Sequence, residues 1–196
     1  IRKDHKNFKE AHRSLKADRE VVMTAISFTP YFCLSDCDLP GDKDVVLEAI
    51  IKNPFNFCYA HPRLQQDREV IKAAADGNYF ILEEVSLAHR GDLEFMMKIV
   101  EKHGAALQFA TQELKENKEL VRRAVDKEGA AFVYAGPTAK KDRTIVLAAL
   151  KKGLKLQQVP TEFREDEDVM ALIIQNGDVV THATQKMKES PSFMEA

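Results

Sequence analysis

The sequence predicts an all-α fold, an α-solenoid of about seven tandem repeats, each roughly 25 residues long. One observation is a short pattern, an Asp or Asn followed three places later by a pair of apolar residues. It begins at Asp18, Asp42, Asp67, Asp92, Asn117, Asp142 and Asp166, so successive starts differ by 24, 25, 25, 25, 25 and 24 residues. The other observation is that the apolar residues inside each repeat follow helical spacing.

The first half of each repeat predicts a long helix. The opening Asp or Asn is a preferred N-cap, because its side chain accepts hydrogen bonds from the free N–H groups of the first turn. Acidic residues at position 3, such as Glu20 and Glu94, suit the positive end of the helix dipole. Apolar residues at positions 4, 5, 8 and 9 form one buried stripe. The helix is expected to stop near position 13, at Pro30, Pro54, Gly104, Gly129, Gly153 and Gly177.

The second half of each repeat predicts a short helix and one further helical turn. Apolar residues occupy positions 16, 19 and 23, as in Leu107, Ala110 and Leu114, and this spacing is that of one helical face. Residues that cap or break helices mark position 20. They are Asp36, His61, Ser86, Thr111, Gly136, Pro160 and Thr184.

A repeat of this size buries its apolar stripe only against its neighbours, so the repeats are expected to stack into one domain over residues 1–196. Residues 1–17 are expected to form a partial N-terminal cap through Phe8 and Leu15. The tail after Met187 is expected to be frayed or to cap the other edge.

The repeat resembles the domain-of-unknown-function family 4116. The resemblance lies in the Asp-Arg-Glu-Val-Val opening and in the Leu-Gln-Phe-Ala-Thr-Gln-Glu-Leu-Lys-Glu segment of residues 107–116, and the best copies are residues 42–66 and 92–141. Residues 67–91, where His89 replaces an apolar residue, and residues 142–165, which are one residue short, depart from it. The resemblance implies short helical repeats, known from bacterial proteins including secreted effectors and from protist proteins. It transfers no active site.

Composition and charge narrow the class of function. A formal net charge of −2 gives no overall attraction to nucleic acid or anionic membrane. No apolar run approaches the ~20 residues that span a bilayer, so no membrane span is expected. Three cysteines are too few for a disulfide framework, which favours reduced thiols in an intracellular reducing compartment.

No motif for a nucleophile, base, phosphate loop or cofactor is found, so we expect neither enzymatic activity nor a cofactor, metal or small-molecule site. Cys33 and Cys58 fall at matching repeat positions, about 9–10 Å apart in stacked helices, beyond disulfide reach, and are expected to be small packing residues. The histidines are expected to cap helices or lie on the surface, with His89 a partly buried structural side chain.

Two groups of residues are candidates for binding a partner. Aromatic residues recur at position 18 as Tyr59, Phe109 and Tyr134, and either pack in the core or form a partly exposed ladder for a partner. Lys140, Lys141 and Arg143 belong to a basic stretch that precedes an acidic last repeat. These charges either solvate helix ends or match the charges of a partner.

The function expected from these features is a protein-binding scaffold, either free-standing or as a non-catalytic subunit of a larger assembly. Two alternatives stay open. The repeats are an accessory region of a larger enzyme or secreted effector, because the chain begins at Ile1 and leaves room for an upstream catalytic segment. A nucleic-acid-binding solenoid is the third interpretation, disfavoured by mixed charge and by the absence of Trp.

Overall fold

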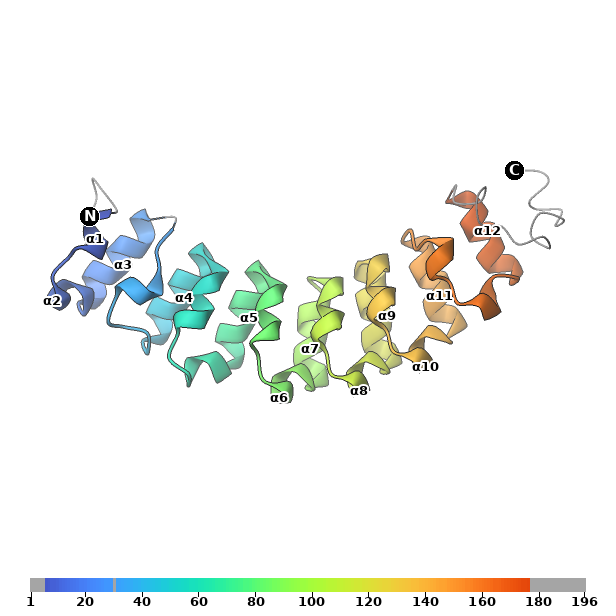
Figure 1. Ribbon diagram of the computed structural model, residues 1–196, viewed down its shortest axis with the longest axis horizontal. Coiled ribbons are helices and arrows are strands. Elements are labelled where there is room, and N and C mark those ends of the chain that lie inside the picture. The colour runs from blue at the N-terminus through green and yellow to red at the C-terminus, as the bar shows by residue number, and fades with distance from the viewer. Residues whose placement is uncertain (1–5, 30, 177–196) are drawn as a thin grey trace. The chain divides into compact units, whose positions relative to one another are not determined.

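The computed structural model describes residues 6–29 and 31–176, and the described residues contain helices and no strand. The fold is all-α, as the sequence predicts (Figure 1). The α-helices are α1 (Lys6–Lys9), α2 (Arg13–Lys16), α3 (Arg19–Phe28), α4 (Lys43–Lys52), α5 (Arg68–Gly77), α6 (Leu87–Arg90), α7 (Leu93–Val100), α8 (Gln112–Lys115), α9 (Lys118–Lys127), α10 (Pro137–Lys140), α11 (Arg143–Lys151) and α12 (Glu167–Gln175). The 3-10 helices are η1 (Leu34–Asp36), η2 (Pro54–Tyr59), η3 (Leu64–Gln66), η4 (Tyr79–Glu83), η5 (Gly104–Phe109), η6 (Gly129–Tyr134), η7 (Leu156–Gln158) and η8 (Thr161–Phe163).

The chain divides into two compact units, with the boundary between His89 and Arg90. In the first unit the long helices α3, α4 and α5 pack side by side in chain order. In the second unit α7, α9, α11 and α12 do the same. Each unit is therefore a stack of repeats in which every long helix covers the apolar stripe of the next.

All seven residues predicted to open a repeat are N-caps of long helices. The side chain of Asp18 accepts hydrogen bonds from the Glu20 and Val21 N–H groups, and Asn117 does the same for Glu119 and Leu120. Asp42, Asp67, Asp92, Asp142 and Asp166 cap the other five helices. The predicted stripe is buried as well, with Phe95, Met96, Ile99 and Val100 forming the core face of α7.

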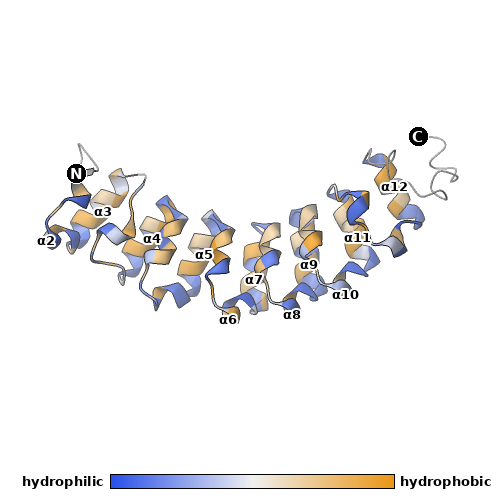
Figure 2. Ribbon diagram, in the orientation of Figure 1, coloured by the Kyte–Doolittle hydropathy of each residue, from blue (hydrophilic) through white to orange (hydrophobic). Residues whose placement is uncertain are grey.

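The second half of a repeat is a 3-10 helix followed by a separate short helix, which confirms the predicted short helix and further turn, but positions 16, 19 and 23 do not lie on one continuous helical face. Leu107 lies within η5, Ala110 is its C-cap, and Leu114 lies in α8. A 3-10 helix has three residues per turn, so residues three apart are aligned on one side. Gly104, Leu107 and Ala110 are aligned in this way and all are buried. Figure 2 shows that the outlying helices α8 and α10 are mostly hydrophilic.

Two glycines at predicted helix stops, Gly104 and Gly129, act by close packing, whereas Gly153 has a left-handed backbone and nothing packed against it. Among the described residues only Gly153 has a positive φ, of 85°. A Cβ on Gly104 would lie 2.4 Å from the Ala124 carbonyl oxygen, and one on Gly129 would lie 2.7 Å from the Lys152 carbonyl oxygen. Each glycine therefore lets η5 or η6 approach the long helix of the following repeat. Pro30 and Gly177 lie outside the described residues.

The predicted N-terminal cap is half correct. Phe8 is buried and its ring lies 5.6 Å from that of Phe32 in a tilted pair. Leu15 is instead 44% exposed, because no residue of the short helix α2 is buried. The tail after Met187 lies outside the described residues, and the extent of the domain over residues 1–196 remains a prediction.

Candidate interaction surfaces

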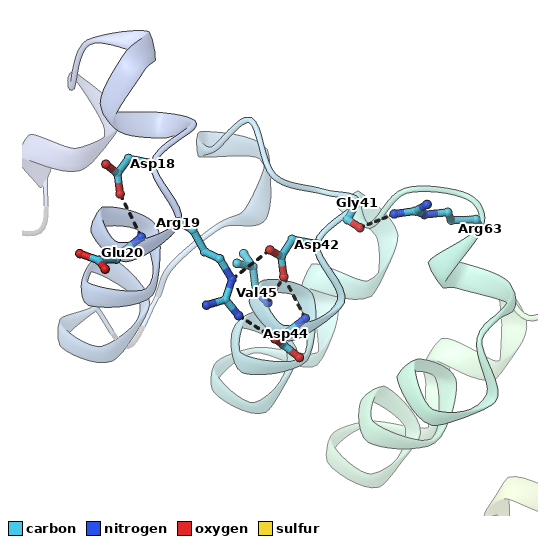
Figure 3. Close-up of polar contacts among 8 residues, drawn as sticks. All are labelled: Asp18, Arg19, Glu20, Gly41, Asp42, Asp44, Val45 and Arg63. Atoms are coloured by element: carbon cyan, nitrogen blue, oxygen red, sulfur yellow. Dashed lines mark hydrogen bonds and ion pairs between the residues drawn. The ribbon is translucent and has the colours of Figure 1, made fainter.

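One set of ion pairs between successive repeats uses a basic residue at position 2. Its side chain reaches the N-cap carboxylate of the following repeat, and in three cases also the acid at position 3 of that repeat. Arg19 lies 3.1 Å from Asp42 and 2.6 Å from Asp44 (Figure 3). The same pairing recurs as Lys43 with Asp67 and Glu69, Lys118 with Asp142, and Arg143 with Asp166 and Asp168. One carboxylate thus caps its own helix and holds the preceding repeat.

The three basic residues predicted to bind a partner, Lys140, Lys141 and Arg143, lie in different environments. Arg143 makes two hydrogen bonds to Asp166, of 2.8 and 2.9 Å, so the basic stretch and the acidic last repeat partly neutralise each other. Lys140 donates to the Val133 carbonyl oxygen at 2.7 Å. Lys141 is exposed at the C-cap of α10. Lys140 and Arg143 are therefore engaged in contacts within this unit, and both Arg143 and Lys141 are exposed to solvent.

The ion pairs and caps lower the pKa values of the N-cap carboxyl groups. Hydrogen bonds from the Lys118 ammonium and from Thr144 lower the pKa of Asp142 to about 2. Lys43 lowers the pKa of Asp67, and Arg143 lowers that of Asp166. Burial acts to raise the pKa of Asp42, but hydrogen bonds from the Val45 N–H and from Arg19 outweigh it and the pKa is lowered.

We expect acid to destabilise the stacked repeats between about pH 4 and pH 2. A carboxyl group has a pKa of about 3.9 when unfolded. Because the folded pKa of Asp142 is lower, its stabilisation is fully present above the unfolded value and is lost as the pH falls through the folded value. Thermal unfolding of the protein at pH 5, 4, 3 and 2 measures this loss as a falling Tm.

The variant Asp142→Asn provides the matched control, because Asn117 already caps the preceding repeat without a titrating group. Its Tm should be lower at neutral pH but should change less than that of the wild-type protein between pH 4 and pH 2. Parallel Tm curves for the two proteins would contradict the assignment of the acid effect to Asp142.

The predicted position-18 aromatics do not form one ladder. Tyr59 at the end of η2 is about half exposed, whereas Phe109 and Tyr134 at the ends of η5 and η6 are half-buried. In the intervening repeat the same position holds Glu84. Tyr59 belongs to the first unit and the other two residues belong to the second. The second-unit pair is therefore mainly packing, and Tyr59 alone is substantially open to a partner.

A different row of aromatic side chains is exposed in the first unit. Tyr31, Phe55 and Phe80 each lie three residues after the last residue of a long helix, following α3, α4 and α5. They are 84%, 59% and 54% exposed, and we call them the aromatic row. Phe80 also stacks on Tyr79 with ring centroids 4.7 Å apart. In the second unit the residues three after α9 and α11 are Ala130 and Leu154, and Leu154 is buried.

His12, His61 and His89 make local contacts, as expected, whereas His5 and His182 lie outside the described residues. The rings of His12 and His61 accept hydrogen bonds from the Ser14 and Arg63 N–H groups. His89 is half-buried, and its Nδ1 lies 3.0 Å from the Ser86 hydroxyl at the start of α6. A polar contact within one helical turn thus explains why a histidine occupies this usually apolar position.

The cysteines are free thiols, and one differs from its predicted role. Cys33 is half-buried and Cys37 is buried, but Cys58 is exposed, so it is not a packing residue. Its neighbours Phe57 and Ala60 face the core, and the turn of η2 directs Cys58 outward. Burial raises the pKa of the Cys37 thiol, which also donates to the Leu34 carbonyl oxygen.

The family model of the domain of unknown function (DUF4116) matches residues 42–88 and 92–138. Residues 42–88 and 92–138 are therefore repeats of this family. Each match begins at an N-cap residue, Asp42 or Asp92, and covers nearly two of the repeats described above. The first match includes residues 67–88 and ends just before His89. No curated protein and no solved structure matches the chain.

The DUF4116 repeats contain one polar contact that the sequence pattern does not reveal. Asn56 is 1% exposed and lies at a position that holds Ile81, Ala106 and Ala131 in the following repeats. Its side chain accepts from the Leu34 N–H at 2.7 Å and donates to the Phe32 and Ala49 carbonyl oxygens at 3.0 and 2.9 Å. The sequence signal that could have indicated this contact is a single Asn at a repeat position that is otherwise apolar.

No described helix of the DUF4116 repeats is long and apolar enough to cross a membrane. Among the described residues, no three His, Cys, Asp or Glu side chains gather as metal ligands would. Several carboxylates instead act as helix caps, some of them for a helix in a neighbouring repeat. Glu128 accepts from the Ala105 N–H at 3.1 Å, and Glu116 accepts from Thr138 and Ala139 at the start of α10.

Proposed function

We propose that this chain is a protein-binding repeat scaffold, and that the aromatic row is the centre of its interaction surface. The observation that carries the proposal is the distribution of exposed apolar side chains. Among the described residues the exposed large ones are Leu15, Phe28, Tyr31, Ile51, Phe55, Tyr59, Phe80, Leu87 and Leu93, and all except Leu93 belong to the first unit.

Clustered exposed aromatic residues favour protein binding over other roles. Exposed apolar surface costs free energy in water, and aromatic residues carry a large share of the energy in protein interfaces. Repetition supports the same interpretation, because equivalent places in successive repeats present one kind of side chain along the stack. The charged groups of the long-helix N-termini are meanwhile paired with one another, as Arg19 is with Asp42 and Asp44. Such paired charges offer less to a polyanion than a one-signed surface does.

Affinity capture with the paired variant Tyr31→Ser and Phe55→Ser tests this proposal. The wild-type protein captures partners from its source cell, and quantitative mass spectrometry measures the amount recovered. We expect the paired variant to recover at least about tenfold less of these partners. Both side chains are exposed, so the circular dichroism spectrum should be unchanged.

Leu87→Ser is the matched control, because Leu87 is 66% exposed in the same unit but lies on α6, outside the aromatic row. It should capture the same partners as the wild-type protein. If the paired variant and the control recover partners equally well, the aromatic row is not the interaction surface.

A further inference from the structure

We infer that the aromatic row binds an extended, proline-rich peptide segment in the polyproline II conformation, with acidic residues between its prolines. This inference rests on the proposed function and names the class of its partner. It is carried by the spacing of the row, by a small cavity beside Tyr31, and by an exposed cation at the C-terminal end of α4.

The spacing of the row fits this type of chain. Tyr31, Phe55 and Phe80 come from successive repeats, and α3, α4 and α5 pack against one another in that order. Packed helices lie about 8–10 Å apart, so equivalent residues recur at about that interval. A polyproline II helix has three residues per turn and rises about 3.1 Å per residue, or about 9 Å per turn. Every third residue of such a peptide would therefore face one aromatic side chain.

A helix or a β-strand fits the row less well. An α-helical peptide brings the same face back about every 5.4 Å, and a strand brings it back about every 7 Å. Aromatic-lined grooves are also the usual receptors for polyproline II segments, because proline rings pack flat on aromatic faces and the peptide loses little conformational entropy. The three exposed rings of the row supply that kind of surface.

A cavity at the Tyr31 end of the row supplies a place for one peptide residue. Its volume is about 240 Å³ and its lining includes Phe8, Tyr31, Phe32 and Thr29. Pockets that enclose a drug-sized ligand measure about 300–1,000 Å³, so this one fits part of an extended chain better than a whole small molecule. The buried Thr29 hydroxyl, which also lines the cavity, has no hydrogen-bond partner among the described residues.

That hydroxyl is a donor of the kind that a polyproline II segment requires. Such a segment forms no internal hydrogen bonds, so its carbonyl oxygens are free to accept hydrogen bonds from a receptor. A buried polar group without a hydrogen-bond partner is destabilising, so a peptide carbonyl that accepted from the Thr29 hydroxyl would remove that cost. Thr29 is 7% exposed, and a shift of its neighbour Tyr31, which is open to solvent, would give access to it.

Charge complementarity selects acidic residues between the prolines. Lys52 is the last residue of α4, is exposed, and lies three residues before Phe55. Its ammonium group makes no ion pair with any side chain in residues 6–29 and 31–176. A carboxylate on the peptide would be attracted to this cation, and that attraction would weaken with added salt.

Direct titration of the whole protein with three dye-labelled twelve-residue peptides tests the inference by fluorescence anisotropy. The probes repeat Pro-Pro-Glu, Pro-Pro-Lys and Gly-Ser-Glu. We expect the Pro-Pro-Glu peptide to bind, the Pro-Pro-Lys peptide to bind several-fold more weakly, and the Gly-Ser-Glu peptide to bind at least about tenfold more weakly. Equal binding of the Pro-Pro-Glu and Gly-Ser-Glu peptides would overturn the inference, because charge alone would then explain it.

Single substitutions locate the binding. Tyr31→Ala and Phe55→Ala should each weaken binding of the Pro-Pro-Glu peptide by about tenfold. Leu87→Ala should not change the affinity for this peptide. Lys52→Gln should abolish the difference between the Glu and Lys peptides. If no proline-rich probe binds while the paired aromatic variant still loses its captured partners, this inference fails and the proposed scaffold function stands. If the captured partners are also unaffected, both fail.

Discussion

Asn56→Ala is expected to destabilise the first unit by about 2–4 kcal/mol, the largest effect that we expect from a single polar side chain. The substitution leaves the Leu34 N–H and the Phe32 carbonyl oxygen without their hydrogen-bond partner between two repeats. Because Asn56 is 1% exposed, water does not replace the lost bonds without a rearrangement of the interface.

Amide hydrogen exchange gives the most specific measurement of this effect. The Leu34 N–H, which donates to the Asn56 side chain at 2.7 Å, should lose at least about tenfold in protection. Urea unfolding followed by circular dichroism should show a lower midpoint for the transition of the first unit. The two compact units need not unfold in a single transition. Hydrogen exchange of amides in each unit therefore reports the stability of that unit separately.

Asn53→Ala is the control for the loss of an Asn side chain. Asn53 caps η2 through one hydrogen bond to the Phe55 N–H and is only half-buried. Removing such a cap costs about 1 kcal/mol, and the Leu34 amide should keep its protection. An Asn56→Ala variant as stable as Asn53→Ala would show that the inter-repeat bonds of Asn56 contribute little.

Gly104→Ala is expected to destabilise the second unit by about 2 kcal/mol or more, since overpacking a tight contact typically costs about 1–3 kcal/mol. The new Cβ would lie 2.4 Å from the Ala124 carbonyl oxygen and 2.8 Å from the Glu128 Cβ. A flexible side chain could move aside, but the backbone of α9 cannot do so without shifting the repeat. Glu128 also accepts a hydrogen bond from the Ala105 N–H, so the cap of η5 would be disturbed too.

Urea unfolding of Gly104→Ala beside Gly41→Ala isolates the packing effect. A Cβ on Gly41 would lie 3.6 Å from the nearest Arg63 atom, an ordinary contact, and its φ is not positive. Gly41→Ala should therefore be within about 0.5 kcal/mol of the wild-type protein. Equal unfolding midpoints for the two variants would mean that η5 and α9 are not held as closely as the structure places them.

The first half of each repeat was predictable because its determinants are local. An N-cap such as Asp18 acts within three residues of itself, and the stripe of α7 follows from helical spacing alone. The start of each long helix therefore agrees with the sequence pattern. The 3-10 helices were not predictable, because spacings of three and four residues are shared by 3-10 and α-helical turns when only a few residues are available.

The environments of the predicted binding residues could not be predicted from the sequence, for a reason of the same kind. Arg143 belonged to a basic stretch in the sequence, but its partners Asp166 and Asp168 are more than 20 residues away and are reached only in the stacked repeats. Aromatic residues recur at position 18, which predicts a binding surface there, but recurrence alone does not distinguish buried rings from exposed ones. Tyr31, Phe55 and Phe80 recur equally well and are the exposed set.

By itself the sequence determined the period of the repeat, its helical class, the seven N-caps and the buried stripe, because each depends on interactions within a few residues. Tertiary structure alone decided which charges pair between repeats, which glycines permit close approach, and which aromatic side chains remain in solvent. Those features depend on distances between neighbouring repeats, such as the 2.8 Å from Lys43 to Asp67, which no one-dimensional pattern contains.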